Sequence, residues 1–113
     1  MGEYSATQLD GIFTALSDPT RRAILARLSG SDARVTDIAA GFPISLNSVS
    51  KHIRMLERAG LVRREVQGRD HVLSLQAAPL ADAQAWIEKY RSFWEDSLAA
   101  LDAYVTNRKG KRR

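Results

Sequence analysis

The sequence predicts a mainly helical fold with one β-hairpin, in the element order α-α-α-α-β-β-α. Three observations support this prediction. Before residue 60, apolar residues recur every three or four positions, which is the period of amphipathic helices. Between residues 61 and 75 the pattern changes to the alternation that is typical of strands. From Pro79 the helical period returns and continues to about residue 105, so a long helix closes the fold.

The composition is that of one folded domain. The chain has 113 residues, of which 44% are hydrophobic and 27% are charged. Cysteine is absent, which excludes disulfides, thiol catalysis and thiolate metal sites. No apolar run approaches the roughly 18 residues of a membrane span, and the first residues do not resemble a signal peptide. We therefore expect a cytoplasmic protein that makes no membrane contact.

The charge is unevenly distributed along the chain. Residues 108–113 carry five positive charges, and the rest of the chain has 12 basic residues against 13 acidic ones. Residues 47–75 hold six basic and three acidic residues, whereas residues 76–107 hold two basic and five acidic. This gradient would direct a polyanion to the middle of the chain. We expect a single domain over residues 1–107 and a basic, disordered tail over residues 108–113, which either strengthens nonspecific DNA binding or only aids solubility.

Two capped helices open the fold. Residues 5–8 form a capping box for a helix that ends near Leu16. Asp18 is placed to cap the second helix, Pro19 suits its first position because no N–H is needed there, and Gly30 ends it. The first helix gathers its apolar side chains on one side, namely Leu9, Ile12, Phe13 and Leu16.

The next two helices predict a helix-turn-helix. Residues 35–41 form a short helix with Thr36 as its cap, and the next three residues are too few for anything but a turn. The helix that follows over residues 45–59 has Ser45 as its N-cap, and Gly60 stands where a left-handed residue is needed to end it. A short capped helix, a tight turn and a second capped helix constitute this motif.

The helix over residues 45–59 has two opposite faces. Val49, Ile53 and Leu56 fall on one side, with Leu46 beside them. The opposite side carries a polar and cationic set, which consists of Asn47, Lys51, Arg54 and Arg58. Such a helix is expected in a DNA major groove, although the same pattern also fits a surface helix with solvated charges.

The strand pattern after Gly60 predicts a β-hairpin. Its two strands cover residues 61–66 and 71–75, and Gly68 supplies the positive φ that a tight turn needs. A hairpin that directly follows a helix-turn-helix is a wing, and its arginines would contact phosphate or a minor groove; these are Arg63, Arg64 and Arg69. The alternative is a hairpin that only covers the core and keeps its arginines solvated.

The long helix from Pro79 to about Val105 predicts a homodimer. Its apolar residues step by three and four in a regular seam, which consists of Leu80, Ala83, Ile87, Tyr90, Trp94, Leu98, Leu101 and Val105. This is more apolar surface than so small a domain covers by itself, and a second copy is the simplest way to bury it. The alternative is that the seam packs only on the first helix of its own chain.

Three motifs follow one another along the chain at residues 16–25, 48–53 and 56–62. They read Leu-Ser-Asp-Pro-Thr-Arg-Arg-Ala-Ile-Leu, Ser-Val-Ser-Lys-His-Ile and Leu-Glu-Arg-Ala-Gly-Leu-Val. In this order and spacing they resemble the signatures of the ArsR family of winged-helix repressors, over residues 9–105. The resemblance implies a homodimeric bacterial transcription repressor with a winged helix-turn-helix, dimerising through its first and last helices and reading DNA with the helix over residues 45–59.

The metal sites known in that family do not carry over to this chain. The cysteines used at the start of the recognition helix are missing, and the last helix contains no histidine. The two histidines, His52 and His71, lie on different elements and make a poor metal pair. Residues 90–95 look more like the non-metal branch of the family. We therefore expect no metal and no cofactor, and relief of repression by an unidentified small molecule or protein.

Two sets of residues form the predicted sites. The DNA-binding set is Ser45, Asn47, Ser48, Ser50, Lys51, His52, Arg54, Arg58, Arg63, Arg64 and Arg69, in which Asn47 is best placed to contact a base edge. The dimer-interface set is Leu9, Ile12, Phe13, Leu16, Ile87, Tyr90, Trp94, Leu98, Leu101 and Val105.

These features predict a regulator of transcription that binds double-stranded DNA as a homodimeric repressor on a palindromic operator. The alternative is a winged-helix module for protein–protein contact with only nonspecific DNA affinity. An enzyme is not expected, because the sequence has no nucleophile–base pattern, no paired-carboxylate motif and no Gly-rich phosphate loop.

Overall fold

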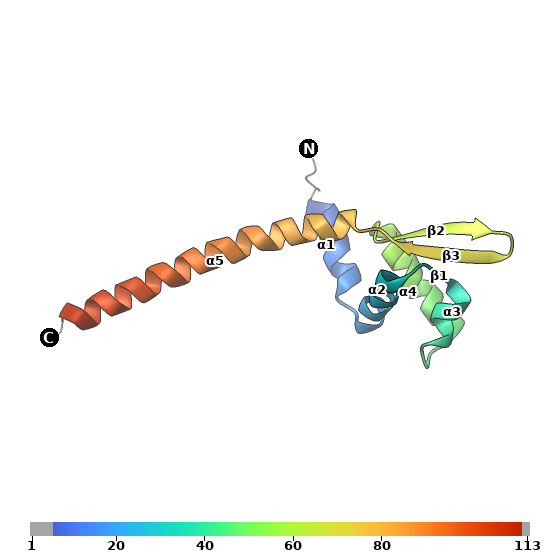
Figure 1. Cartoon of the computed structure of the whole chain (residues 1–113), viewed down its shortest axis with the longest axis horizontal. Coiled ribbons are helices and arrows are strands. Elements are labelled where there is room, and N and C mark those ends of the chain that lie inside the picture. Colours follow the sequence, from blue (N-terminus) through green and yellow to red (C-terminus); the bar gives the residue numbers. More distant parts are fainter. Residues whose placement is uncertain (1–5, 112–113) are drawn as a thin grey trace. The chain divides into compact units, whose positions relative to one another are not determined.

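The computed structural model describes residues 6–111 and confirms a mainly helical fold with a β-hairpin (Figure 1). The elements follow one another as α1 (Ala6–Leu16), α2 (Pro19–Gly30), β1 (Ala33–Arg34), α3 (Val35–Ala40), α4 (Leu46–Arg58), β2 (Val62–Gln67), β3 (Asp70–Leu75) and α5 (Ala78–Lys111). The predicted order is therefore correct with one addition, the short strand β1. The predicted capping box begins at Ser5, which lies outside the described residues.

Packing divides the chain into two units. The first unit reaches Ala83 and contains the first four helices, the sheet and the beginning of α5. The second unit begins at Gln84 and consists of the remainder of α5. None of the helices formed by residues 6–111 is long and apolar enough to cross a membrane.

The sheet has three antiparallel strands in the spatial order β1-β3-β2. Leu73 in β3 lies opposite Ala33 of β1 and Arg64 of β2, and its side chain is fully buried. The sequence does not predict β1, because a strand of two residues is too short to show alternation and this part reads as a polar loop. Its pairing with β3 ties the start of α3 to the hairpin.

The core of the first unit is built around α4. Val49, Ile53 and Leu56 are fully buried, as their helical spacing predicts. They pack in one cluster with buried side chains from the other helices and the sheet, which include Ala15, Ile24, Leu25, Leu28, Ile38, Leu61, Val62 and Leu73. The buried face of α4 leaves the opposite face to the solvent.

Of the predicted helix N-caps, three lie within the described residues, and two of these are confirmed. A carboxylate oxygen of Asp18 accepts a hydrogen bond from the Arg21 backbone N–H at 3.0 Å, and Ser45 Oγ accepts from the Ser48 N–H at 3.1 Å. The third prediction, Thr36, is wrong, because the cap position of α3 is Arg34 and no side chain bonds there. The strand β1 runs directly into α3, and the pairing of β1 with β3 places the start of the helix at Val35.

The C-terminus of α4 is closed by a Schellman motif. Gly60 has φ 75, its N–H donates to Glu57 O at 3.0 Å, and the Leu61 N–H donates to Leu56 O at 3.0 Å. Leu56 and Leu61 are both fully buried, so the apolar contact that accompanies this motif is part of the core. The motif therefore fixes the direction in which the chain leaves α4 and enters β2.

The hairpin closes with a two-residue turn. Gln67 pairs with Asp70, so the turn consists of Gly68 and Arg69. Gly68 has φ 63 and, within the described residues, no side-chain-bearing residue has a positive φ. A positive φ at the first turn residue alone is the pattern of a type II′ turn, whose twist matches paired strands. The predicted role of Gly68 is confirmed.

The last helix continues farther than the sequence predicts. α5 begins at Ala78 and ends at Lys111, whereas we expect its end near Val105 and a disordered tail from residue 108. The disordered tail over residues 108–113 stays a prediction. No proline follows Val105, so each residue up to Lys111 can keep its backbone N–H bond, although Gly110 is a poor helix former.

Replacement of Gly60 by alanine tests the Schellman motif. A Cβ at a positive φ costs about 1–2 kcal/mol, so the free energy of unfolding in urea should fall by that amount at a fixed protein concentration. Gly11→Ala is the matched control, because Gly11 lies inside α1 and a Cβ added there would meet no atom within 4 Å. That control should raise the free energy of unfolding by about 0.5–1 kcal/mol. Equal effects of the two substitutions would contradict the assignment.

Candidate DNA-binding site

The exposed face of α4 presents a polar and cationic surface. Asn47, Lys51 and Arg54 are exposed, opposite the buried Val49 and Ile53. Within residues 6–111, the side chains of Asn47, Lys51 and Arg54 make no hydrogen bond and no ion pair with the protein. Their donors and charges are therefore available to an external ligand.

The serines at the start of α4 have different surroundings. Ser45 caps the helix and also donates from Oγ to Ser48 Oγ at 3.0 Å, so capping occupies its acceptor. Ser50 is half-buried and lines a hollow that α4 shares with the hairpin. The hydroxyls of Ser48 and Ser50 thus remain the better placed donors for a contact with DNA.

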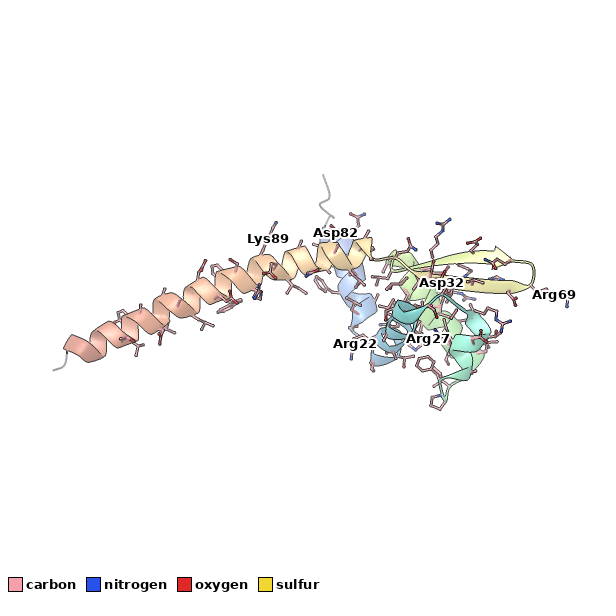
Figure 2. The ribbon with its side chains drawn as sticks, viewed as in Figure 1. Arg22, Arg27, Asp32, Arg69, Asp82 and Lys89 are labelled. Atoms are coloured by element: carbon pink, nitrogen blue, oxygen red, sulfur yellow. The ribbon has the colours of Figure 1, made fainter. Side chains whose placement is uncertain are left out.

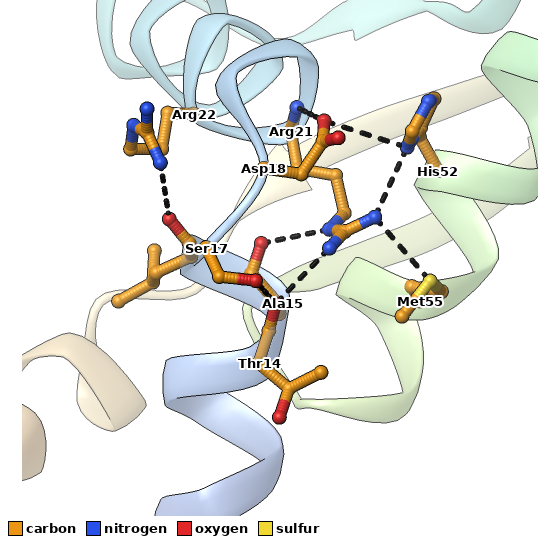
Figure 3. A network of polar contacts seen from close by, with 9 residues as sticks. Thr14, Ala15, Ser17, Asp18, Arg21, Arg22, His52 and Met55 are labelled. Atoms are coloured by element: carbon orange, nitrogen blue, oxygen red, sulfur yellow. Dashed lines mark hydrogen bonds and ion pairs between the residues drawn. The ribbon is translucent and has the colours of Figure 1, made fainter.

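His52 lies against α2, although we expect it in the DNA-binding set. Its Nδ1 atom is 3.2 Å from an Arg21 guanidinium nitrogen and 3.7 Å from an Asp18 carboxylate oxygen, and the ring is half-buried (Figure 3). The arginine keeps its protons, so at the shorter distance Arg21 donates and Nδ1 accepts. The contact with Asp18 would require a proton on Nδ1, which is incompatible with the bond from Arg21. His52 belongs to the packing of α4 on α2.

Arg21 is a buried cation that joins three helices (Figure 3). Its Nε donates to Ala15 O at 2.8 Å and one terminal nitrogen donates to Thr14 O at 3.0 Å, which satisfies carbonyls at the end of α1. The other terminal nitrogen reaches His52 and, at 3.4 Å, the Met55 sulfur, both on α4. Arg21 itself belongs to α2. One side chain of α2 therefore makes directional bonds to both α1 and α4.

Asp18 completes this cluster. The bond from the Arg21 backbone N–H lowers the pKa of the Asp18 carboxyl, and the positive Arg21 side chain nearby lowers it further. Sequence reasoning gives Asp18 its capping role but misses Arg21, because an arginine between Thr20 and Arg22 reads as a solvated surface cation. The only sequence signal for Arg21 is its place in the first family-like motif.

Arg64 is held by the protein and is not free on the wing. It forms a two-point ion pair with Glu57 of α4, at 2.7 and 3.1 Å, and contacts His71 Nδ1 at 3.0 Å. The hydrogen bonds from Arg64 to Glu57 raise the pKa of the Arg64 guanidinium. Arg64 pairs with Leu73 in the sheet, so strand alternation turns it toward α4. Within the chain Arg64 ties the wing to α4, and a DNA contact by this residue stays a prediction.

The other two wing arginines are exposed. Arg63 occupies the opposite face of β2 from Arg64, and Arg69 lies at the tip of the hairpin (Figure 2). Neither side chain makes a hydrogen bond or an ion pair with the rest of residues 6–111.

Arg34 of β1 is a further arginine near the hairpin, and sequence reasoning misses it. Its side chain pairs with Asp37 at 3.0 Å and with Asp70 at 3.9 Å, and so it joins β1 to the hairpin.

Arg58 stands apart from the start of α4. It is exposed and lines two hollows of about 480 and 250 Å³ next to α1, together with Gly11 and Ala59. Eleven residues separate it from Asn47, or about 16 Å along the helix axis. A DNA contact by Arg58 stays a prediction, and it would involve a different part of the helix from the contacts of Asn47.

The predicted dimer set divides into buried and exposed residues. Ile12 is fully buried inside its own chain and does not reach the surface, so its place in that set is corrected. Leu9, Phe13 and Leu16 are half-buried, and Leu16 packs against the core. The predicted set on α5 is exposed by 41–59% within the chain, and it consists of Ile87, Tyr90, Trp94, Leu98, Leu101 and Val105.

The described residues do not gather a metal-binding set. No group of three or more His, Asp or Glu side chains within residues 6–111 is placed to hold a metal ion. The imidazoles of His52 and His71 are instead engaged by Arg21 and Arg64.

A helix-turn-helix followed by a paired hairpin, with an exposed cationic helix, defines a winged helix-turn-helix protein. A family model described as a helix-turn-helix domain matches residues 16–65. The chain is 38% identical over 79 residues to the transcriptional repressor SdpR of Bacillus subtilis, in an alignment that covers 70% of this chain and 88% of SdpR.

Two solved structures agree with this comparison. A crystal structure of an ArsR family transcriptional regulator is 41% identical, with a TM-score of 0.77, over 82% of this chain and 96% of the other. An ArsR-like regulator from Rhodococcus sp. RHA1 is 32% identical, with a TM-score of 0.72, over 84% and 90% of the two chains. The chain belongs to the ArsR family and is a DNA-binding transcriptional regulator rather than an enzyme.

Substitution of Arg21 by methionine tests the buried cluster. It leaves Ala15 O without the bond from Arg21 and removes one of the donors to Thr14 O, so the free energy of unfolding in urea should fall by about 1–3 kcal/mol. The matched control is Arg22→Met, because Arg22 is exposed and makes one bond, to Leu16 O at 2.8 Å. That control should cost less than about 1 kcal/mol. Losses of the same size would show that burial of Arg21 does not hold the helices.

Proposed function

We propose that the chain is a homodimeric repressor that binds a palindromic operator through α4 and the hairpin. The observation that carries this proposal is the exposed face of α4, where Asn47, Lys51 and Arg54 are free of partners in the described chain. The free arginines of the hairpin, Arg63 and Arg69, extend the same cationic character to the wing. Phosphate neutralisation by such residues supplies much of the affinity for DNA, and repression follows from occupation of a promoter.

The roles within this surface differ. Asn47 is the second residue of α4, and an amide at the N-terminal end of a reading helix can bond adenine through two atoms. Lys51 and Arg54 carry charge farther along the same face and contact phosphate. Base contacts give sequence preference, whereas phosphate contacts fix the position of the protein on any sequence.

The second unit supports the proposal of a dimer. From Ile87 to Val105 the apolar residues are spaced by three or four positions, as in helices that pack along a seam. Trp86 and Tyr90 have ring centroids 4.3 Å apart, and Phe93 meets Trp94 edge-on at 5.9 Å, so the aromatic groups contact each other along the helix while exposed. A second copy would bury this seam. Residues up to 107 would then form one domain.

The proposed dimer accounts for a palindromic site. Two reading helices related by a two-fold axis meet half-sites about one helical turn of DNA apart. A signal that favours another dimer geometry would change that spacing and release the operator. We propose a signal other than a metal ion, since cysteine is absent and α5 carries no histidine. The signal is an unidentified small molecule or protein.

Alanine substitutions test the roles of Asn47 and Lys51. Asn47→Ala should cost about 1–3 kcal/mol on the preferred operator and little on random DNA, because it removes a base contact. Lys51→Ala should weaken binding to both and flatten the dependence on salt, because it removes a phosphate contact. Fluorescence anisotropy titrations at several salt concentrations measure both effects. Identical behaviour of the two variants would contradict the assigned roles, and absence of duplex binding at low salt would favour the protein–protein module.

Leu98→Glu tests the dimer. A carboxylate in the apolar seam opposes association, so the dissociation constant of the dimer should rise at least about tenfold. Ser92→Glu is the matched control, since it adds the same charge about 120° around the exposed part of α5 and should leave association unchanged. Sedimentation velocity over a range of concentrations measures the dissociation constant. A monomeric wild-type protein would refute the proposal directly.

A further inference from the structure

Leu46 is an exposed apolar residue at the start of the reading helix. It is the first residue of α4, and 52% of its surface is exposed, whereas Val49, Ile53 and Leu56 on that helix are fully buried. The helical period predicts Leu46 beside the buried face. It lies instead one turn before the core begins, and it is not among the side chains that pack against the core.

The surroundings of Leu46 are polar and belong to the candidate DNA-binding site. A hollow of about 200 Å³ lies where α3, α4 and the hairpin meet. Leu46 and Ser50 line it from α4, and the other lining residues are Arg34, Val35, Thr36, Arg64, Arg69, Asp70 and His71. Polar side chains predominate in this lining, and Arg69 among them makes no ion pair within the described residues. An apolar side chain among such polar groups fits the edge of a base pair beside the phosphate backbone of DNA.

We infer that Leu46 determines specificity by contacting the 5-methyl group of a thymine in each half-site. This inference rests on the proposed function. Among the groups that base pairs present in the major groove, the thymine methyl is the apolar one, and an apolar side chain recognises it by excluding water. Leu46 directly precedes Asn47, so both side chains start from the same turn of α4. Leu46 therefore selects a thymine near the base that Asn47 bonds.

Deoxyuridine substitution isolates this contact, because it removes the methyl group of thymine and changes nothing else in the base. Sequences bound by the wild-type protein are first selected from random DNA, and each thymine of the selected operator is then replaced in turn. Wild-type affinity should fall about three- to fivefold at one symmetric pair of positions. Leu46→Ala should bind the thymine and deoxyuridine operators equally well, and Leu46→Met should retain most of the wild-type discrimination.

The other results separate a failure of the inference about Leu46 from a failure of the proposed function. If no replacement weakens wild-type binding, or if Leu46→Ala keeps the full loss at the same positions, the inference about Leu46 is overturned while the proposed function stands. If the selection yields no preferred sequence, the proposed function fails and the inference fails with it. Thermal unfolding of Leu46→Ala should match the wild type closely, because the residue is exposed and outside the core.

Discussion

The bonds of the buried Arg21 guanidinium fix how α4 is oriented against α1 and α2. A cation placed inside a small domain has to find hydrogen-bond acceptors, and Arg21 finds them at the end of α1 and on α4. Helix ends leave carbonyls unsatisfied, so the same bonds meet a need of α1 as well. The apolar cluster supplies most of the driving force for packing, but apolar contacts are not directional. The directional bonds of Arg21 select one arrangement of the three helices.

The sequence predicts the fold well where local chemistry decides the structure. Asp18, Ser45, Gly60 and Gly68 set helix and turn boundaries through their own side chains or backbone freedom, and all four act as expected. The failures involve partners that are distant along the chain. The strand β1 forms only because β3 lies beside it. With β1 in place, α3 begins at Val35, and Thr36 is not its cap.

The same distinction holds for the candidate site. Helical spacing identifies the exposed face of α4 correctly, because it depends only on the period of one element. Charge alone does not show which cations are free. Arg64 and His52 resemble DNA contacts in the sequence, but Glu57 and Arg21 engage them, and these pairings are 7 and 31 residues apart. Leu46 shows the reverse error. Its position in the helical period suggests burial, but it stands at the end of the helix and is exposed.

The ion pair between Glu57 and Arg64 has a mechanical consequence. It links the reading helix to the first strand of the wing, and the Schellman motif joins the same two elements only a few residues away. With two attachments, a change in the angle between α4 and β2 has to break either the ion pair or the capping bonds. A displacement of α4 that keeps these bonds therefore carries β2 with it.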